Sequence, residues 1–275
     1  GILGSASLPV AASQKRVISE KNGKKFCSSS NPSDPSFSQN RRLAQEVLIA
    51  LFVAGVREIL LSPSSRNAPF VDLLTCSKKF HIYTCPEERS AAFFAVGRIM
   101  TTRRPVAIFT TSGTAAAELL PATMEAFYGS LPLVLVTADR PRRFRGTGAP
   151  QSALQEKLFG PYTPHAEDLE TTDSCHLHLW DQKHPAHLNV CLEEPEKFPL
   201  DEESSIDAAL DLFAQGKMED RSAIFSFTTK SGPEKILAFL QQSAFPFAIV
   251  GALTASMRPF VRQFLLNAQL PVYLE

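Results

Sequence analysis

Short apolar runs alternate with helical patterns over the first two thirds of the chain. The runs read as buried strands at residues 56–61, 80–84, 105–111, 132–138 and 186–191. Helical spacing of apolar residues predicts a helix that begins at Asn40 as its N-cap and ends before Gly55, and two more helices over 88–100 and 114–128. Short apolar strands alternating with helices predict an α/β fold, in which helices cover both faces of a parallel sheet.

The regions outside this pattern suggest the domain organisation. Residues 1–39 lack periodicity and include a stretch rich in Ser, Pro and Asn, so we expect a disordered or linker segment there. Residues 40–195 form the predicted parallel-sheet domain. Residues 196–275 follow an acidic connection and hold predicted helices over 206–215, 232–243 and 257–268 and strands over 247–252 and 271–275. Because the chain stops on a strand, we expect this second α/β domain to be incomplete.

Small and polar loops follow four of the predicted strands. They are Ser62–Arg66, Thr84–Glu88, Thr111–Thr114 and Ala138–Pro141. The carboxyl ends of parallel strands meet at one edge of the sheet, where ligands bind in open α/β sheets. The sequence therefore predicts a ligand site built from these loops.

Several residues of these loops are candidates for chemistry. Glu88 opens a helix, where an acidic residue is favoured by the helix dipole alone, but the apolar helix that follows could bury it and make it a proton donor or acceptor. Three arginines lie at or beyond strand ends: Arg66, Arg140 and Arg145. Each is either a solvated surface residue or a partner of a carboxylate or phosphate ligand. For Gln151 and Gln155, a capping or surface role is the simplest reading.

Composition and charge narrow the classes of function. Lys and Arg together number 28, as do Asp and Glu, so no global field favours nucleic acid or an anionic membrane. No apolar run reaches the roughly 18 residues of a membrane span. Five widely spaced cysteines predict free thiols in a reducing compartment, which favours the cytoplasm. The cysteine and histidines between 175 and 187 fit no usual zinc spacing, so we predict no metal ligand there.

Six segments together resemble one known family. They are SPSSRNAPF (62–70), EERSAAFFAVG (87–97), PVAIFTTSGTAAAELLPATMEA (105–126), PLVLVTADRP (132–141), GAPQSALQEKLFG (148–160) and HLNV (187–190). Their order and spacing resemble 2-succinyl-5-enolpyruvyl-6-hydroxy-3-cyclohexene-1-carboxylate synthase, the MenD family of thiamine-diphosphate enzymes. The resemblance covers residues 40–200 well and continues weakly to 275.

This resemblance implies a reaction and roles for particular residues. The family joins a succinyl unit from 2-oxoglutarate, after loss of carbon dioxide, to isochorismate in menaquinone biosynthesis. Residues 40–195 would be the pyrimidine-binding domain, with Glu88 as the catalytic glutamate on the aminopyrimidine ring. Ser112, Gly113 and Thr114 would also bind thiamine diphosphate. Arg66, Arg140 and Gln151 would contact the two acidic substrates.

Some positions depart from the family pattern. Ser64 replaces a usual glycine, Glu87 a usual aspartate, and Pro150 a usual asparagine, while Arg142 and Arg143 replace a Pro-Glu pair. The segment between Leu169 and His187 is short, so we expect one helix to be reduced or lost. These changes bear on substrate geometry more than on cofactor handling.

The family's diphosphate-binding motifs are missing from the chain. The Gly-Asp-Gly motif and the Asn that hold Mg²⁺ would lie in a further domain or a second subunit of a homodimer or homotetramer. We therefore expect the 275 residues to be inactive alone. Two alternatives remain open: another thiamine-diphosphate carboligase or decarboxylase, or a non-catalytic pyrimidine-domain subunit that depends on a partner.

Overall fold

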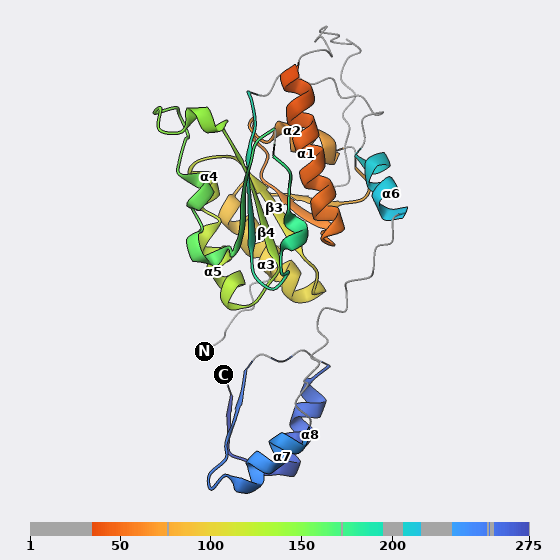
Figure 1. Ribbon diagram of the computed structural model, residues 1–275, viewed down its shortest axis with the longest axis vertical. Coiled ribbons are helices and arrows are strands. Elements are labelled where there is room, and N and C mark those ends of the chain that lie inside the picture. Colours follow the sequence, from red (N-terminus) through yellow and green to blue (C-terminus); the bar gives the residue numbers. More distant parts are fainter. Residues whose placement is uncertain are drawn as a thin grey trace, which may run out of the picture. The chain divides into compact units, whose positions relative to one another are not determined.

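Figure 1 shows the computed structural model, which describes residues 35–75, 77–171, 173–194, 206–215, 233–251, 253 and 256–274. The chain divides into two compact units, residues 1–219 and 220–275. Each unit has its own sheet, and both sheets are parallel.

Six parallel strands form the sheet of the first unit. They are β1 (Glu58–Leu61), β2 (His81–Thr84), β3 (Val106–Thr110), β4 (Leu133–Asp139), β5 (His165–Leu169) and β6 (Ala186–Cys191). Their order across the sheet is β2-β1-β3-β4-β6-β5, and every neighbouring pair is parallel. The predicted α/β class with a parallel sheet is therefore confirmed.

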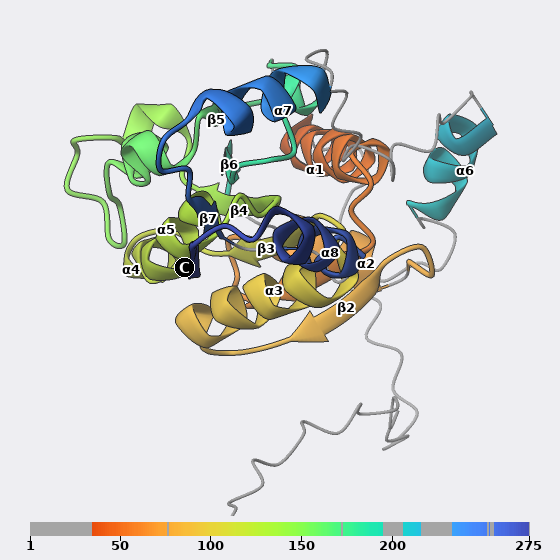
Figure 2. The ribbon, with the colours of Figure 1, turned by 90° about the horizontal axis from the view of Figure 1, so that it is seen from below.

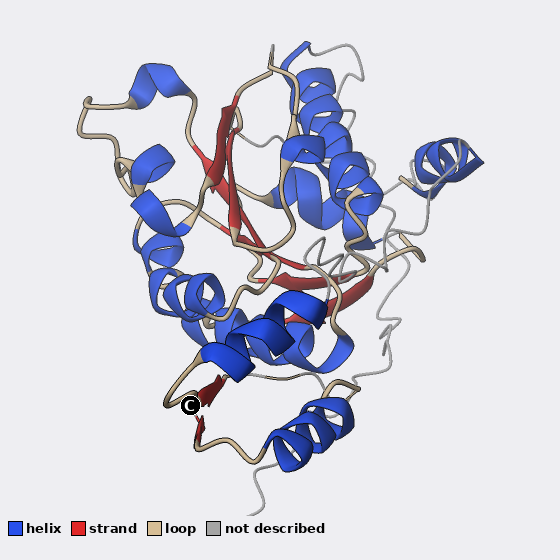
Figure 3. Cartoon of the chain, turned by 60° about the horizontal axis from the view of Figure 1, so that its bottom comes forward, coloured by secondary structure: helices blue, strands red, loops and turns tan. Residues whose placement is uncertain are grey.

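Helices cover both faces of this sheet, as Figures 2 and 3 show. On one face, α1 (Pro35–Val53) and α2 (Ala68–Thr75) share a core with Ile59 and Leu61 of β1. On the other, α3 (Glu88–Thr102) and α5 (Leu120–Tyr128) share a core with Leu60. Successive strand residues point to opposite faces, and because helices cover both faces the central strands β3 and β4 are buried at every position.

Two elements differ from the prediction. Strand β5 was not predicted, because its sequence HAEDL carries polar side chains that a strand with one neighbour at the sheet edge tolerates. The predicted helix over 114–128 is divided into α4 (Thr114–Ala117) and α5, whose first turn contains Pro121. Proline has no N–H to continue a preceding helix. Among the described residues between β5 and β6, the helical structure is the short 3₁₀ helix η4 (Leu177–Leu179); the loss of a helix relative to the family stays a prediction.

The start of α1 also differs. The helix begins at Pro35, so Asn40 is not its N-cap and residues 35–39 of the predicted linker are helical. Asn40 is instead buried, and its amide accepts a hydrogen bond from Glu193 N (2.9 Å) and donates one to Glu193 O (3.4 Å). Gly55 follows the helix with φ +91°, as predicted for the residue after a helix end.

Helix α6 (Asp207–Gln215) packs on the first unit. Ile206 and Leu210 are buried in the core beneath α1. The carboxylate of Asp207 accepts hydrogen bonds from Ser77 Oγ (2.5 Å) and Lys78 N (2.8 Å). This helix lies beyond the boundary predicted after residue 195, and the placement of that boundary stays a prediction.

The second unit contains α7 (Pro233–Gln242), β7 (Ala248–Val250), α8 (Arg258–Ala268) and β8 (Val272–Leu274). Its two strands are paired in register, with Ile249 opposite Tyr273. No described side chain of this unit is buried, and large apolar ones such as Phe245 (92% exposed) and Phe260 (77%) face solvent. The four described elements therefore do not enclose a core of their own.

Candidate active site

The carboxyl edge of the six-stranded sheet contains a reversal of strand order. From β1 the chain crosses to β2 on one side, and β3 then adds on the other side of β1. At such a point the loops after the two strands diverge, and open α/β sheets bind ligands in the resulting crevice. The loops after β1 and β3 therefore flank the position that the topology favours for a ligand.

The loop after β1 is held by one asparagine. Asn67 is fully buried, and its amide accepts from Ser64 N (2.8 Å) and donates to Ser62 O (2.9 Å). Ser62 Oγ donates to Cys85 O (2.8 Å), which joins this loop to the loop after β2. Ser64 is not in the left-handed region, so the replacement of glycine at that position causes no backbone strain.

Two adjacent glutamates at the start of α3 have different roles. The side chain of Glu87 caps the helix and accepts from Ser90 N (2.7 Å) and Arg89 N (3.1 Å). Hydrogen bonding by Ser90 and Arg89 holds the pKa of the Glu87 carboxyl below its usual value. The carboxylate of Glu88 has no hydrogen-bond or ion-pair partner among the described residues. Because Glu87 occupies the capping position, Glu88 is left available to a ligand.

Glu88 is less buried than the sequence suggested. The apolar face of α3 was expected to enclose its carboxylate, but the residue is only partly buried in this chain. The buried side of α3 is formed by Ala91, Ala92, Ala95, Val96 and Ile99, which begin after the first three residues of the helix. The expectation of a dry pocket around Glu88 is therefore wrong for the described residues.

The loop after β3 is tied to two glutamines. Gly113 has φ +77°, and a Cβ placed there would come within 2.9 Å of Gln151 Cγ. Gln151 Nε2 donates to Ser112 O (2.9 Å), and Gly113 N donates to Gln155 Oε1 (3.0 Å). Gln151 is exposed, as a surface role would require, and its role toward a substrate stays a prediction; the surface role suggested for Gln155 is wrong, because Gln155 is fully buried. The Gly113 amide is already used, so it is not free to bind an anion.

Arg66 and Arg140 converge on one carboxylate. Arg66 Nη2 donates to Glu194 Oε2 (2.6 Å), and Arg140 Nη1 lies 3.8 Å from the same oxygen. Arg66 also donates from Nη1 to Leu192 O (3.1 Å), and Arg140 from Nε to Pro150 O (3.1 Å). The loops after β1, β4 and β6 therefore meet at Glu194.

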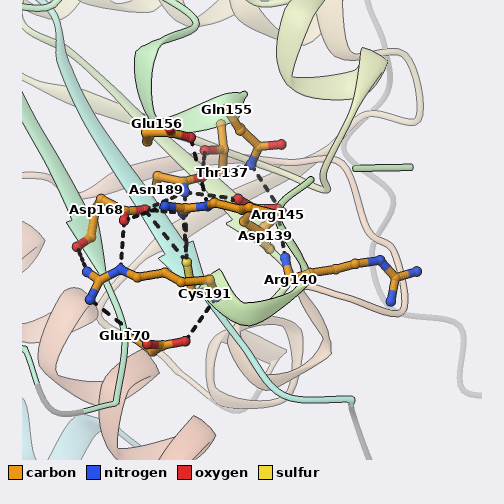
Figure 4. Close-up of polar contacts among 12 residues, drawn as sticks. Thr137, Asp139, Arg140, Arg145, Gln155, Glu156, Asp168, Glu170, Asn189 and Cys191 are labelled. Atoms are coloured by element: carbon orange, nitrogen blue, oxygen red, sulfur yellow. Dashed lines mark hydrogen bonds and ion pairs between the residues drawn. The ribbon is translucent and has the colours of Figure 1, made fainter. Parts of the chain in front are cut away.

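Arg145 forms its contacts within a different set of residues, which we call the arginine cluster. The cluster consists of Asp139, Arg142, Arg145, Asp168, Asn189 and Cys191. Arg145 forms two hydrogen bonds to Asp168, from Nη1 (2.9 Å) and Nη2 (2.6 Å). Figure 4 shows Arg145 within this cluster, whereas the guanidinium of Arg140 points away from it. The suggestion that Arg145 serves a ligand is not supported by this pairing.

The charges of the arginine cluster stabilise one another. Burial alone would raise the pKa of Asp168, but hydrogen bonds from Arg145, Asn189 and Arg142 outweigh it and hold that pKa well below its usual value. The hydrogen bond to Asp168 in turn raises the pKa of Arg145. Burial raises the pKa of the Cys191 thiol, and the nearby Asp168 carboxylate raises it further. Cys191 is therefore a neutral thiol packed against an ion pair.

Arg142 and Arg143, which replace the family's Pro-Glu pair, are both paired. Arg142 donates to Asp168 Oδ2 (2.8 Å) and Asp173 Oδ2 (2.5 Å). Arg143 forms a bidentate pair with Glu193 (2.5 and 2.6 Å). These arginines therefore tie the loop after β4 to the segments after β5 and β6.

A buried chain of hydrogen bonds links the arginine cluster to the loop after β3. Asn189 Nδ2 donates to Asp139 (3.1 Å) and Asp168 (2.8 Å), which fixes the orientation of its amide. Its Oδ1 then accepts from Gln155 Nε2 (2.8 Å) and Thr137 Oγ1 (3.0 Å). Because the Thr137 proton is used there, His187 Nε2 must donate to Thr137 (2.7 Å). Burial lowers the pKa of His187 to about 3, so its imidazole is neutral.

The cysteines and histidines between 175 and 187 are separated by the fold. His184 pairs with Asp181 (2.7 Å), His176 lies 3.5 Å from Glu167, and His187 lies inside β6. Among the described residues, no group of three or more His, Cys, Asp or Glu side chains is arranged to hold a metal ion. Cys85, Cys175 and Cys191 are free thiols. Of the helices that the structure describes, none is long and apolar enough to cross a membrane.

Comparison with known proteins identifies the class of this domain. Residues 41–158 match the family described as "Thiamine pyrophosphate enzyme, N-terminal TPP binding domain". Together with the six-stranded parallel sheet, this match defines the first unit as the N-terminal domain of a thiamine pyrophosphate (thiamine diphosphate) enzyme.

Relatives of known name narrow the class to one family. The chain is 40% identical over 240 residues to a protein of Bdellovibrio bacteriovorus (86% of this chain, 43% of the relative) and 31% identical over 246 residues to one of Lysinibacillus sphaericus (84% and 42%). A protein of Akkermansia muciniphila is 46% identical over 155 residues (55% and 29%). All three are named 2-succinyl-5-enolpyruvyl-6-hydroxy-3-cyclohexene-1-carboxylate synthase. This chain belongs to that family, the MenD family, and spans less than half of the length of these relatives.

Proposed function

We propose that the protein containing this chain decarboxylates 2-oxoglutarate and adds the succinyl unit to isochorismate, in menaquinone biosynthesis, with thiamine diphosphate as cofactor. The similarity to synthases of that name supports the reaction. The structural observation that carries the proposal is the carboxylate of Glu88, the first residue of α3, which has no partner among the described residues and follows the capping residue Glu87. A carboxylate in this state is ready to accept a hydrogen bond from a heterocycle.

The residues present fit the pyrimidine end of the cofactor. We assign Glu88 to the aminopyrimidine ring, where its carboxylate would hold a proton on a ring nitrogen. Ser112, Gly113 and Thr114 would line the same end, since Gln151 and Gln155 fix the loop after β3. When bound, thiamine diphosphate supplies the carbanion chemistry. We propose that Mg²⁺ is a second cofactor and that this chain supplies none of its ligands. Another domain or subunit would bind the diphosphate end of the cofactor.

The acidic substrates would be bound by Arg66, Arg140 and Gln151. Both substrates are dicarboxylates, and guanidinium groups bind carboxylates through charge-assisted hydrogen bonds. Arg140 is held at Nε by a carbonyl oxygen, which leaves its terminal nitrogens on the side away from the arginine cluster. Among the described residues, its Nη1 reaches only the highly exposed Glu194 carboxylate, at 3.8 Å.

The direct test is a substrate profile of the full-length gene product. With thiamine diphosphate and Mg²⁺, we expect consumption of 2-oxoglutarate that depends on isochorismate, with release of carbon dioxide and formation of the adduct by mass spectrometry. Preference for pyruvate would indicate another carboligase or decarboxylase. Activity that appears only with a co-purifying diphosphate-domain chain would indicate a partner-dependent subunit. The absence of any 2-oxoglutarate consumption in all of these mixtures would contradict the proposal.

A further inference from the structure

The carboxylate of Glu194 joins two arginines that come from distant parts of the sequence. Arg66 follows β1 and Arg140 follows β4, and in the sheet these two strands are separated by β3. Glu194 follows β6 and reaches both, at 2.6 Å from Arg66 Nη2 and 3.8 Å from Arg140 Nη1. Both guanidinium groups approach the same oxygen, Oε2. One side chain therefore gathers the two arginines into a pair.

Burial explains why Arg66 needs this partner. Only 8% of the Arg66 side chain is exposed, and a buried charge without a counterion is strongly unfavourable. Leu192 O satisfies Nη1 of Arg66, and Glu194 satisfies Nη2 and supplies the negative charge. Without that charge, Arg66 would keep one carbonyl partner and would repel Arg140.

The pair keeps a net positive charge that a ligand can use. Two guanidinium groups and one carboxylate sum to one positive charge, and the Glu194 side chain is 77% exposed. The neighbouring Glu193 differs, because its hydrogen-bonded partner is Arg143, which it holds in a bidentate pair, while Arg66 acts on it only electrostatically. Glu194 thus holds the arginines together without fully neutralising them.

We propose that Glu194 is a positioning residue that aligns Arg66 and Arg140 as one receptor for a carboxylate of the substrate. The inference rests on the proposed function, because that function assigns the two arginines to acidic substrates. Glu194 acts through the arginines, and it is not proposed to touch the reacting atoms. Its removal should therefore weaken substrate binding more than turnover.

The experiment compares Glu194→Gln with Glu193→Gln in the full-length protein. Gln keeps the shape of the side chain and removes its charge. For Glu194→Gln we expect the KM for one of the two dicarboxylates to rise about tenfold, as for loss of a charge-assisted contact, with kcat within about twofold. Glu194→Asp, which restores the charge on a shorter side chain, should recover part of that loss. Glu193→Gln should change both KM values far less, because Glu193 hydrogen-bonds Arg143 and acts on Arg66 only electrostatically.

Each other outcome decides against the inference. A KM that falls in Glu194→Gln would mean that the carboxylate competes with the substrate, and an unchanged KM would mean that it does not align the arginines. A parallel fall of kcat and thermal stability in both Glu194 variants would indicate a purely structural role. If the wild-type protein turns over neither acid, the proposed function fails, and the inference fails with it. Normal wild-type turnover with an unchanged KM in Glu194→Gln overturns the inference alone.

Discussion

Arg140 and Arg145 lie five residues apart in the same loop, yet their surroundings differ sharply. Arg145 is enclosed by the arginine cluster, where Asp168 binds it through both oxygens. Arg140 donates one hydrogen bond from Nε to a carbonyl oxygen, lies 3.8 Å from the exposed Glu194 carboxylate at Nη1, and faces away from the cluster. An arginine whose two terminal nitrogens both donate to a carboxylate stabilises the fold, whereas one whose terminal nitrogens make no hydrogen bond with the described residues can bind a ligand. Their positions near a strand end do not distinguish them, and only the family resemblance favoured Arg140.

Glu87 and Glu88 show the same contrast between two neighbouring acidic residues. Glu87 uses both carboxylate oxygens to cap α3, and Glu88 uses neither with any described residue. Each pair of neighbours therefore offers a matched experiment, in which one residue should affect stability and the other the reaction.

The largest effect is expected for Glu88→Gln. If Glu88 holds a proton for the cofactor, its loss should lower kcat of the full-length protein by about 10²–10⁴-fold, the range typical of general acid–base catalysis. The free energy of unfolding should change by less than about 1 kcal/mol, because the carboxylate has no partner to lose. Steady-state kinetics and urea unfolding measure the two quantities. Wild-type turnover in this variant would remove Glu88 from the mechanism.

Arg145→Gln and Arg140→Gln should separate stability from substrate binding. Arg145→Gln leaves Asp139 and Asp168 without their shared cation, so we expect a loss of about 1–3 kcal/mol, less than for a fully buried pair because 22% of the Arg145 side chain is exposed. Arg140→Gln should raise a substrate KM about tenfold with little loss of stability. Urea unfolding and steady-state kinetics on both variants measure the two effects. Equal increases of KM in the two variants would contradict the assignment of Arg140, and not Arg145, to substrate binding.

His187 should give a pH dependence of stability. In the unfolded chain its pKa is about 6.5, while in the folded protein it is about 3. Between these values the unfolded state binds a proton that the folded state does not, so stability is complete above pH 6.5 and falls as the pH drops. The slope is at most about 1.4 kcal/mol per pH unit.

The measurement is urea unfolding of the isolated chain between pH 7 and 5, where the paired carboxylates stay charged. His187→Gln should flatten the slope, whatever its effect on stability at pH 7. His178→Gln, which changes an exposed histidine, should leave the slope in place. An equal slope in wild type and His187→Gln would contradict a neutral buried imidazole.

The fold was largely predictable because apolar periodicity reports burial directly. The five strands predicted for residues 40–195 are all present, since each is buried on both faces or close to a core. Strand β5 was missed because an edge strand with polar side chains has no such pattern. The start of α1 was missed because Asn40 resembles an N-cap in sequence but bonds to Glu193, 153 residues away. Long-range polar partners leave no local signal.

The same reason limits prediction of the candidate site. Positions at strand ends made Arg66, Glu88 and Arg140 candidates, because topology alone brings those ends together, and the family resemblance added Gln151; their roles stay predictions. The residues that hold the loops in place were not found: Asn67, Gln155, Asn189 and Glu194. For Gln155 the sequence held one weak indication, its position four residues after Gln151 in the same loop segment. For the others, identity depends on partners that only the folded chain brings near.

The smallest effect is expected for Glu87→Ala, the counterpart of Glu88→Gln. Loss of the side-chain cap leaves the first N–H groups of α3 to water, so Tm should fall by about 2–4 °C. Thermal unfolding of the chain measures this, and Glu87→Asp, the residue usual in the family, should restore most of it because aspartate also caps helices well. Turnover of the full-length Glu87→Ala protein should stay within about threefold of wild type. Because Glu87 and Glu88 differ by one position on the same helix, a large kcat loss in Glu87→Ala with normal Tm would reverse their assignment.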